Sequence, residues 1–258
     1  MNRIWAIFAK EIRSYFLSPI AYIVTAGFMV LSGLSFYFRA IYLNQVIQAA
    51  YENGELAVLK QNRINHFLIG PMLGDVGLIL MFLMPVLTMR LFSEEKRQKT
   101  DELLLTSPLT VNQIVISKYL AGLFYAILLV LITLVYMVVL FHYSEPDAGM
   151  AVASYLSLVL FVACVVSLGV FTSSLTENQI VASVSCLILE LIFATFGVAS
   201  RSVGSPTISR ILAYLSLQTH MKSFLDGVIM SEDLIYFVSF AFLFLFLTNR
   251  SVESSRWR

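Results

Sequence analysis

Charged residues are scarce in this sequence. Only 13% of its 258 residues are Asp, Glu, Lys or Arg, whereas a water-soluble domain carries about 25%. So few charges cannot cover the surface of a soluble globule, and 59% of the residues are hydrophobic. The composition excludes a soluble enzyme, a nucleic-acid-binding protein and a disordered chain. The net charge of +1 gives no reason to expect a polyanionic partner. The sequence therefore predicts an all-α integral membrane protein.

Patterns that carry chemistry are also missing. Cys164 and Cys186 lie inside apolar runs, so no structural disulfide is expected. His66, His142 and His220 have no second ligand at metal-binding spacing, so no metal site is expected. The sequence contains no G-x-x-x-x-G-K-[ST] phosphate loop, and the segments between the apolar runs are too short for a nucleotide-binding domain. We therefore expect the chain to be no enzyme and to bind no cofactor itself.

Six segments are apolar enough to span a bilayer, whose core needs about 20 residues of helix. They lie at residues 20–38, 71–89, 119–141, 151–175, 179–199 and 234–248. The chain, 1–258, is therefore expected to form a single transmembrane domain of six helices. Lys and Arg are more frequent in the segments on the side of the two termini than in the other loops. This bias predicts that both termini are cytoplasmic.

The N-terminal segment, 1–18, has the pattern of an amphipathic helix. At about 100° per residue, its large apolar residues fall on one arc. This arc contains Ile4, Trp5, Phe8, Ile12, Tyr15 and Phe16. The opposite side contains Arg3, Lys10, Glu11, Arg13 and Ser14, with Ile7 as the exception. Such a helix lies along the membrane surface and ends at Ser18-Pro19. It either anchors the chain there or also presents its polar face to a soluble partner.

The loop between the second and third segments, at 91–118, has the most distinctive pattern. Its first charged residues are expected to continue the preceding helix into water: Glu94, Glu95, Lys96, Arg97 and Lys99. Thr100 is placed to cap a short helix, and Asp101 and Glu102 suit the positive end of its dipole. Thr110 and Gln113 have the spacing of a capping box, which predicts that another helix begins there.

Three consecutive leucines, Leu103, Leu104 and Leu105, stand in the middle of this loop, and Ser107-Pro108 ends the short helix. Leucines that face water form a poor surface for a monomer, and a groove on a partner protein would cover them. The alternative is that they fold back onto the membrane interface. We favour the partner interpretation.

The segment before the last span, at 200–233, is apolar with helical spacing. It predicts two short amphipathic helices, broken near Ser216 and Gly227, that lie in the outer headgroups or dip into the bilayer. They would form a hydrophobic lid on the outer face.

Glu190 is the ionisable side chain nearest to the middle of a predicted span. A carboxylate at the bilayer centre is costly, so a functional role is the default hypothesis. Ser183, Ser185 and Thr195 could share its surroundings. Two interpretations stay open: a role in translocation, or a protonated side chain that serves only helix packing.

Three stretches of the sequence together resemble the type-2 ABC exporter permeases. They are FAKEIRSYFLSPIAY at the N-terminus, EEKRQKTDELLLTSP after the second span and LSLQTHMKSFLDGVI before the last. The closest likeness is to the gliding-motility permease GldF and its relatives, and more loosely to NosY. The sharpest motif is E-x-x-x-x-T-x-E-L-L-L-T-S-P, matched by Glu95, Thr100, Glu102, Leu103, Leu104, Leu105, Thr106, Ser107 and Pro108. Such permeases commonly have Gly before the Thr, where this chain has Lys99, so the turn could differ.

The resemblance implies a membrane subunit of an exporter in a bacterial inner membrane. Two permease chains, identical or paralogous, would pair with two copies of a cytoplasmic ABC ATPase, which would bind the ATP and Mg²⁺. A periplasmic or membrane accessory protein could join them. The implied interface-helix residues are Phe8, Lys10, Glu11, Arg13, Tyr15 and Phe16. The implied coupling segment comprises Glu94, Glu95, Lys96, Arg97 and residues 100–108, including Asp101.

Two other functions remain open on the sequence alone. One is a stand-alone, proton-coupled secondary transporter that uses Glu190, although the chain shows no inverted repeat. The other is a membrane anchor for an ATPase that transports nothing.

Overall fold

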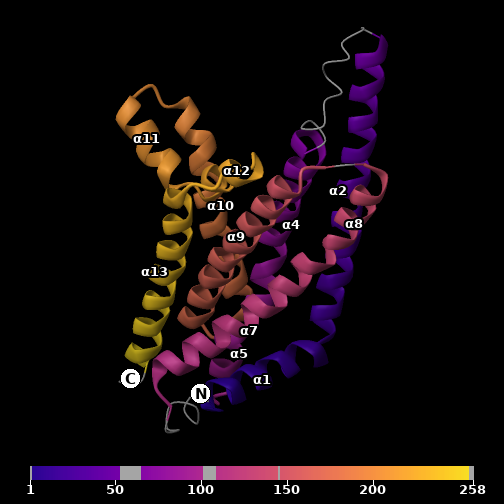
Figure 1. Ribbon diagram of the computed structural model, residues 1–258. Helices are drawn as coiled ribbons and strands as arrows, with labels where there is room; N and C mark the ends of the chain where they lie inside the picture. The colour runs from indigo at the N-terminus through magenta and orange to yellow at the C-terminus, as the bar shows by residue number, and fades with distance from the viewer. Residues whose placement is uncertain (1, 53–64, 101–108, 145, 256–258) are drawn as a thin grey trace.

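The computed structural model describes residues 2–52, 65–100, 109–144 and 146–255, and within these ranges the chain is helical with no β-strand (Figure 1). Six of its helical segments are long and apolar enough to cross a membrane. They are Pro19–Glu52, His66–Arg97, Val111–Tyr143, Ala148–Leu175, Gln179–Ser202 and Ser231–Ser254. The prediction of an all-α integral membrane protein with six candidate spans is confirmed.

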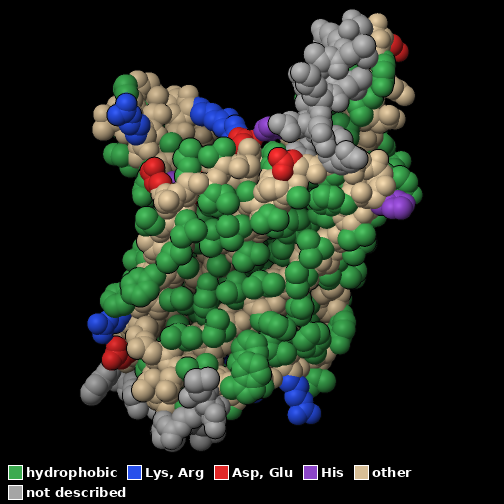
Figure 2. Space-filling model, viewed as in Figure 1, with side chains coloured by type: hydrophobic (Ala, Val, Ile, Leu, Met, Phe, Trp, Pro, Cys, Tyr) green, Lys and Arg blue, Asp and Glu red, His purple; other side chains and the backbone are tan. Residues whose placement is uncertain are grey.

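The outer surface of the bundle is apolar over its middle and charged at its two ends. Figure 2 shows a broad belt of hydrophobic side chains, with Lys, Arg, Asp and Glu gathered above and below it. Large side chains in the middle of the spans are exposed, among them Ile188 of Gln179–Ser202 and Phe242 of Ser231–Ser254, which are 52% and 70% exposed. This distribution fits a bundle whose solvent is lipid, because helices there satisfy their own backbone hydrogen bonds and need no polar exterior.

The helix α9 (Ala148–Leu175) forms the centre of the bundle, and α4 (Gly70–Thr88), α7 (Val111–Ile132), α10 (Gln179–Ser202) and α13 (Ser231–Ser255) pack around it. Its approach to α4 is very close at Gly169. A Cβ atom built on Gly169 would lie 2.0 Å from Thr88 Oγ1. Only a residue without a side chain fits at this crossing, so Gly169 sets the distance between the two helices.

Both described ends of the chain lie at the same end of the bundle, called here the terminal end; the opposite end is the distal end (Figure 1). The helix α1 (Asn2–Leu17) lies across the terminal end, as the amphipathic pattern predicts. Ser18 closes α1, with its N–H bonded to the Tyr15 carbonyl 3.0 Å away, and α2 (Pro19–Glu52) turns into the bundle.

The helix that contains the first predicted span extends beyond it. The predicted span ends at residue 38, before Arg39, and α2 continues to Glu52. The Arg39 guanidinium makes two 2.9 Å hydrogen bonds to the Asp75 carboxylate of α4, and Ser35 donates a third at 2.8 Å. These bonds join α2 to α4 at the point where the apolar run ends.

The third span begins at the predicted capping box. The Thr110 hydroxyl accepts from the Gln113 N–H at 3.3 Å, and the Gln113 side chain accepts from the Thr110 N–H at 3.2 Å. The helix therefore starts at Val111, and an interruption at Thr133 divides it into α7 and α8 (Leu134–Tyr143).

Two short helices lie at the distal end, as predicted: α11 (Pro206–Leu215), which packs beside α10, and α12 (Leu217–Leu225), which lies on α9 (Figure 1). Ser216 separates them and caps α12 by accepting from the Thr219 N–H at 3.3 Å. Gly227, with φ +82°, ends the second. We call this pair the distal lid.

His220 of the distal lid contacts α13, although no acidic residue lies at metal-binding spacing from it in the sequence. His220 Nδ1 lies 2.5 Å from Asp233 Oδ1, and its Nε2 lies 2.8 Å from the Tyr214 carbonyl oxygen. The ring stacks on Tyr236 with centroids 3.9 Å apart. The fold thus brings Asp233 to His220 across 13 residues of sequence. Within the described ranges, no group of three His, Cys, Asp or Glu side chains is placed to hold a metal ion.

Candidate coupling site at the terminal end

Four helices meet at the terminal end of the bundle: α1, α5 (Arg90–Arg97), the start of α7 and the end of α9. The helix α5 follows α4 after a break at Met89, whose N–H bonds to the Pro85 carbonyl 3.0 Å away. It leads directly to the segment that the sequence marks for coupling.

A network of four charged side chains joins α1, α5 and α7. The Lys118 ammonium, on α7, lies 2.8 Å from Glu11 Oε1 of α1 and 2.9 Å from Glu95 Oε2 of α5. The Lys10 ammonium lies 2.8 Å from Glu95 Oε1 and 3.8 Å from Glu11 Oε1. Lys118 also donates to the Leu91 carbonyl, at the start of α5. We call Lys10, Glu11, Glu95 and Lys118 the charge network.

Three members of the charge network are largely removed from water, while the side chain of Lys10 is 58% exposed. The side chain of Lys118 is 1% exposed, that of Glu11 10% and that of Glu95 13%. Burial by itself would lower the pKa of Lys10, but its hydrogen bond and attraction to Glu95 outweigh this effect and raise the pKa above its usual value. Removing one partner from such a set leaves an uncompensated buried charge. The network therefore holds the three helices in one relative position.

The helix α5 is also joined to the end of α9. The Ser173 hydroxyl of α9 accepts from the N–H groups of Phe92 and Ser93, at 3.0 and 3.2 Å, and donates to the Met89 carbonyl at 2.7 Å. These contacts satisfy backbone groups at the break between α4 and α5. Lys96 adds a 2.5 Å hydrogen bond to the Ser174 carbonyl. A displacement of α5 would therefore be transmitted to the central helix.

One residue of α1 lies where its pattern does not predict. Glu11, expected on the polar side, is buried together with Ile7 and Tyr15, at a spacing of four residues. Phe16, on the predicted apolar arc, is 47% exposed, as is expected of a side chain that faces the membrane. Glu11 is buried because Lys118 offers it a cation, which no pattern within α1 could reveal.

Aromatic contacts complete the attachment of α1 to α7. Tyr15 stacks on Tyr125 with ring centroids 5.2 Å apart, and Phe8 meets Phe124 edge-on at 5.8 Å. The Tyr15 hydroxyl donates to the Leu87 carbonyl at 3.3 Å. Lys10 and Arg13 remain on the exposed side of α1. Of the predicted interface-helix residues, Phe8, Glu11 and Tyr15 contact the bundle. Lys10 is exposed but paired with Glu95, and Arg13 and Phe16 are exposed.

Lys118 is the residue that the sequence reasoning missed. It is the one Lys, Arg, Asp or Glu in the stretch from Val111 to Tyr143, which otherwise is an apolar span. A single lysine near the start of an otherwise apolar helix predicts that an acidic side chain is buried beside it. The sequence could not say that its partners would come from both α1 and α5.

The helix α5 ends in a turn that normally favours glycine. The Thr100 N–H bonds to the Glu95 carbonyl at 3.0 Å, and the Lys99 N–H bonds to the Lys96 carbonyl at 3.1 Å. Lys99 adopts φ +55°, in the left-handed region. This is a Schellman turn, whose central position usually holds Gly. Lys99 therefore occupies, with a side chain, a position that suits glycine.

We expect Lys99→Gly to raise the stability of the protein by about 1 kcal/mol, because glycine adopts a positive φ without steric cost. Thermal unfolding of the purified protein in detergent measures this change. Gln98→Gly is the matched control, since Gln98 has φ −84° and gains nothing from glycine. If Lys99→Gly unfolds at a lower temperature than the parent protein, the positive φ of Lys99 does not cost stability.

Of the predicted coupling segment, the structure places Glu94, Glu95, Lys96 and Arg97 on α5, and Thr100 in the turn that follows. The remaining predicted residues, Asp101, Glu102, Leu103, Leu104, Leu105, Thr106, Ser107 and Pro108, lie outside the described residues.

Glu190 is enclosed within the bundle and is 1% exposed. Its Oε1 accepts from the Cys186 thiol of the same helix at 3.2 Å, and its Oε2 has no hydrogen-bond partner among the described residues. Ser185 and Thr195, expected nearby, bond instead to backbone carbonyls of their own helix. A role in translocation and a role in packing both stay predictions.

The fold and this site define a multi-pass helical membrane protein with an amphipathic helix and a charged helical arm at one end. The family model described as ABC-2 family transporter protein matches residues 57–248, and the chain belongs to that family. A comparison with curated proteins finds no match. The family consists of membrane subunits of ABC transporters, which lack the ATPase domain, are not themselves enzymes, and generally work with a cytoplasmic ABC ATPase. The matched region begins beyond α1, so the role of α1 depends on the geometry above.

Proposed function

We propose that this chain is the permease subunit of an ATP-driven exporter in a bacterial inner membrane, with the terminal end in the cytoplasm. Two such chains, identical or paralogous, would form the path, and two copies of an ABC ATPase would bind ATP and Mg²⁺ and drive it. The observation that carries this proposal is the charge network. It joins the interface helix to the arm that bears the coupling segment.

The network supports a lever mechanism. An ATPase that pushes on residues 100–107 would move α5, and Glu95 would pull α1 and α7 through Lys10 and Lys118. Ser173 would carry the same displacement to α9. Packed helices respond to such a push as rigid bodies, which converts a small local shift into a change between two arrangements of the bundle.

The lining of a cavity at the distal end favours a cargo that is amphiphilic. A cavity of about 290 Å³ lies between α4, α9 and the distal lid, with the Arg39–Asp75 ion pair on one wall and Met221 and Leu225 on another. Paired charges beside apolar side chains suit a molecule with a polar and an apolar part. An export system of gliding-motility type, or a related one, would fit this cargo class.

The test is purification of this chain from its native membrane in mild detergent, followed by mass spectrometry and an ATPase assay. We expect an ABC ATPase to co-purify in equal amount, and Leu104→Asp or Glu102→Lys to remove it, because either change alters the coupling segment. Ile229→Asp is the matched control: Ile229 is 55% exposed at the opposite end of the bundle. A pure chain with no ATPase would reject the proposal and favour a secondary transporter.

Reconstitution separates an exporter from a membrane anchor. With the ATPase and ATP in vesicles, an exporter moves an amphiphilic fluorescent probe across the bilayer, whereas an anchor hydrolyses ATP without moving it.

A further inference from the structure

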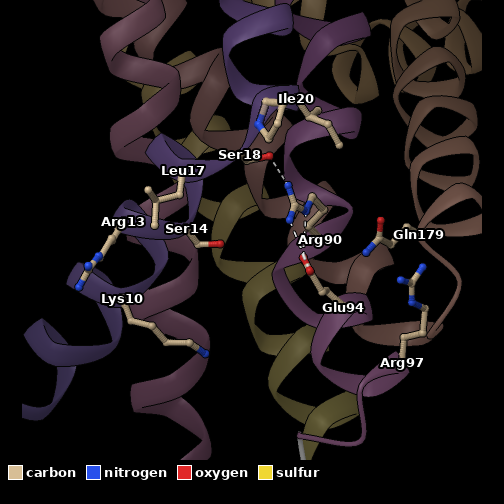
Figure 3. A pocket seen from close by; sticks show the side chains of 11 residues that line it. Lys10, Arg13, Ser14, Leu17, Ser18, Ile20, Arg90, Glu94, Arg97 and Gln179 are labelled. Atoms are coloured by element: carbon tan, nitrogen blue, oxygen red, sulfur yellow. Dashed lines mark hydrogen bonds and ion pairs between the residues drawn. The ribbon is translucent and has the colours of Figure 1, made fainter.

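An open, cationic cavity of about 700 Å³ lies beside the charge network, where α1 turns into α2 (Figure 3). Its size is within the range of small-molecule sites, roughly 300–1,000 Å³. Lys10, Arg13, Arg90 and Arg97 line it together with a single carboxylate, that of Glu94. The excess of cations indicates an anionic ligand.

One arginine of the cavity is held in place. Arg90 Nε lies 2.9 Å from Glu94 Oε2, and its Nη1 bonds to the Ser18 hydroxyl at the bend between α1 and α2 (Figure 3). These contacts fix the plane of the guanidinium, so less entropy is lost when it binds a ligand. They also neutralise much of its charge, so the attraction for an anion must come from other side chains.

Arg13 and Arg97 supply that attraction. Arg13 lies on the exposed side of α1 and Arg97 at the end of α5, and both border the same cavity. Among the described residues, neither has an acidic side chain within ion-pair distance. Figure 3 shows the two side chains on opposite sides of the cavity, so an anion that enters it is attracted by both.

The position of the cavity indicates that its anionic ligand is a lipid headgroup. The cavity lies at the bend between a surface helix and a membrane span, which is the depth of lipid headgroups. Leu17, 72% exposed, and Ile20 form an apolar edge. Val86, Phe82 and Leu78 lie four, eight and twelve residues before Arg90, so they follow one face of α4 away from the cavity. Phe82 and Leu78 are 51% and 41% exposed. An acyl chain can lie along this face.

We propose that this cavity is a binding site for an anionic phospholipid, with the headgroup phosphate inside the cationic cavity and the acyl chains beside α2 and α4. Basic cavities between membrane helices bind such headgroups by charge and hydrogen bonding. The lipid would connect α1 to the arm α5 and so stabilise the arrangement that the charge network also holds. The proposal does not depend on the identity of the transported cargo.

The test is native mass spectrometry of the purified full chain, titrated separately with phosphatidylglycerol and phosphatidylcholine. We expect a one-to-one complex with phosphatidylglycerol. In Arg13→Gln/Arg97→Gln it should bind about 25-fold more weakly, since each basic residue near an anionic lipid contributes about 1 kcal/mol. Arg201→Gln/Arg210→Gln, which removes two exposed arginines at the distal end, should bind as the parent protein does.

Three outcomes would overturn the proposal. Equal binding of phosphatidylcholine would show that charge is not recognised. Unchanged binding in Arg13→Gln/Arg97→Gln would place the lipid elsewhere. Inorganic phosphate that binds as tightly as phosphatidylglycerol would identify a site for a soluble anion, to which acyl chains contribute nothing. Thermal unfolding of each variant without lipid confirms that a change in binding is not a loss of fold.

Discussion

Lys118→Met is expected to lower the stability of the protein by about 3 to 5 kcal/mol, the usual cost of removing one partner from a buried ion pair. Methionine fills a similar volume but leaves the carboxylates of Glu11 and Glu95, 10% and 13% exposed, with Lys10 as their remaining cation in the network. Thermal unfolding in detergent measures the loss. In the proposed exporter, the same change should also separate ATP hydrolysis from transport, because α1 and α7 no longer follow α5.

A second substitution distinguishes charge from packing as the cause. Lys118→Met/Glu11→Gln removes the carboxylate that lies 2.8 Å from Lys118, and it should recover much of the lost stability. Lys222→Met, which removes an exposed lysine at the distal end, should have little effect. If the double variant were no more stable than Lys118→Met, the charge network would not be the source of the loss.

Gly169→Ala is expected to cost about 3 kcal/mol or more, at the upper end of the range for overpacking. The added methyl group would lie 2.0 Å from Thr88 Oγ1 and 2.6 Å from Thr88 Cβ, so α4 and α9 must move apart. Because α9 is the central helix, its other contacts are disturbed as well. Yield of folded protein from the membrane and the unfolding midpoint both report this change.

Gly27→Ala is the matched control for that crossing. A Cβ atom on Gly27 meets no atom within 4 Å, so alanine should be neutral or stabilise α2 by up to about 1 kcal/mol. Thr88→Ala should rescue Gly169→Ala only in part, since the Thr88 Cβ atom remains in the way. A Gly169→Ala protein as stable as Gly27→Ala would show that the two helices are not in close contact there.

The fold was predictable from the sequence to a large extent. Apolar runs specify membrane helices because lipid leaves the backbone few other structures. The distal lid and the capping box at Thr110 also follow from local patterns, since capping and amphipathic spacing are properties of neighbouring residues. The apolar pattern did not show how far α2 continues past Arg39, nor that Asp75, 36 residues later, pairs with this arginine.

The candidate site was only half predictable. The sequence marked α1 and the 94–100 arm as the places where a partner could act, and the structure brings them together. It could not show that Glu11 faces inward, because the reason is Lys118, 107 residues away. The motif that contains Glu95 and Thr100 indicates a protein family. It does not predict that Glu95 forms ion pairs with residues of two other helices.

The sequence by itself determined that this protein is a helical membrane protein with six candidate spans and a charged arm after the second. These properties depend on composition and on spacing within single helices. Only the tertiary structure decided which face of α1 is buried, why Gly169 has no side chain and how Glu11, Glu95 and Lys118 come together in one buried place. Each of these depends on contacts between distant segments. The energy of a buried charge or a close helix crossing is set by the partner, and a pattern within one helix carries no information about that partner.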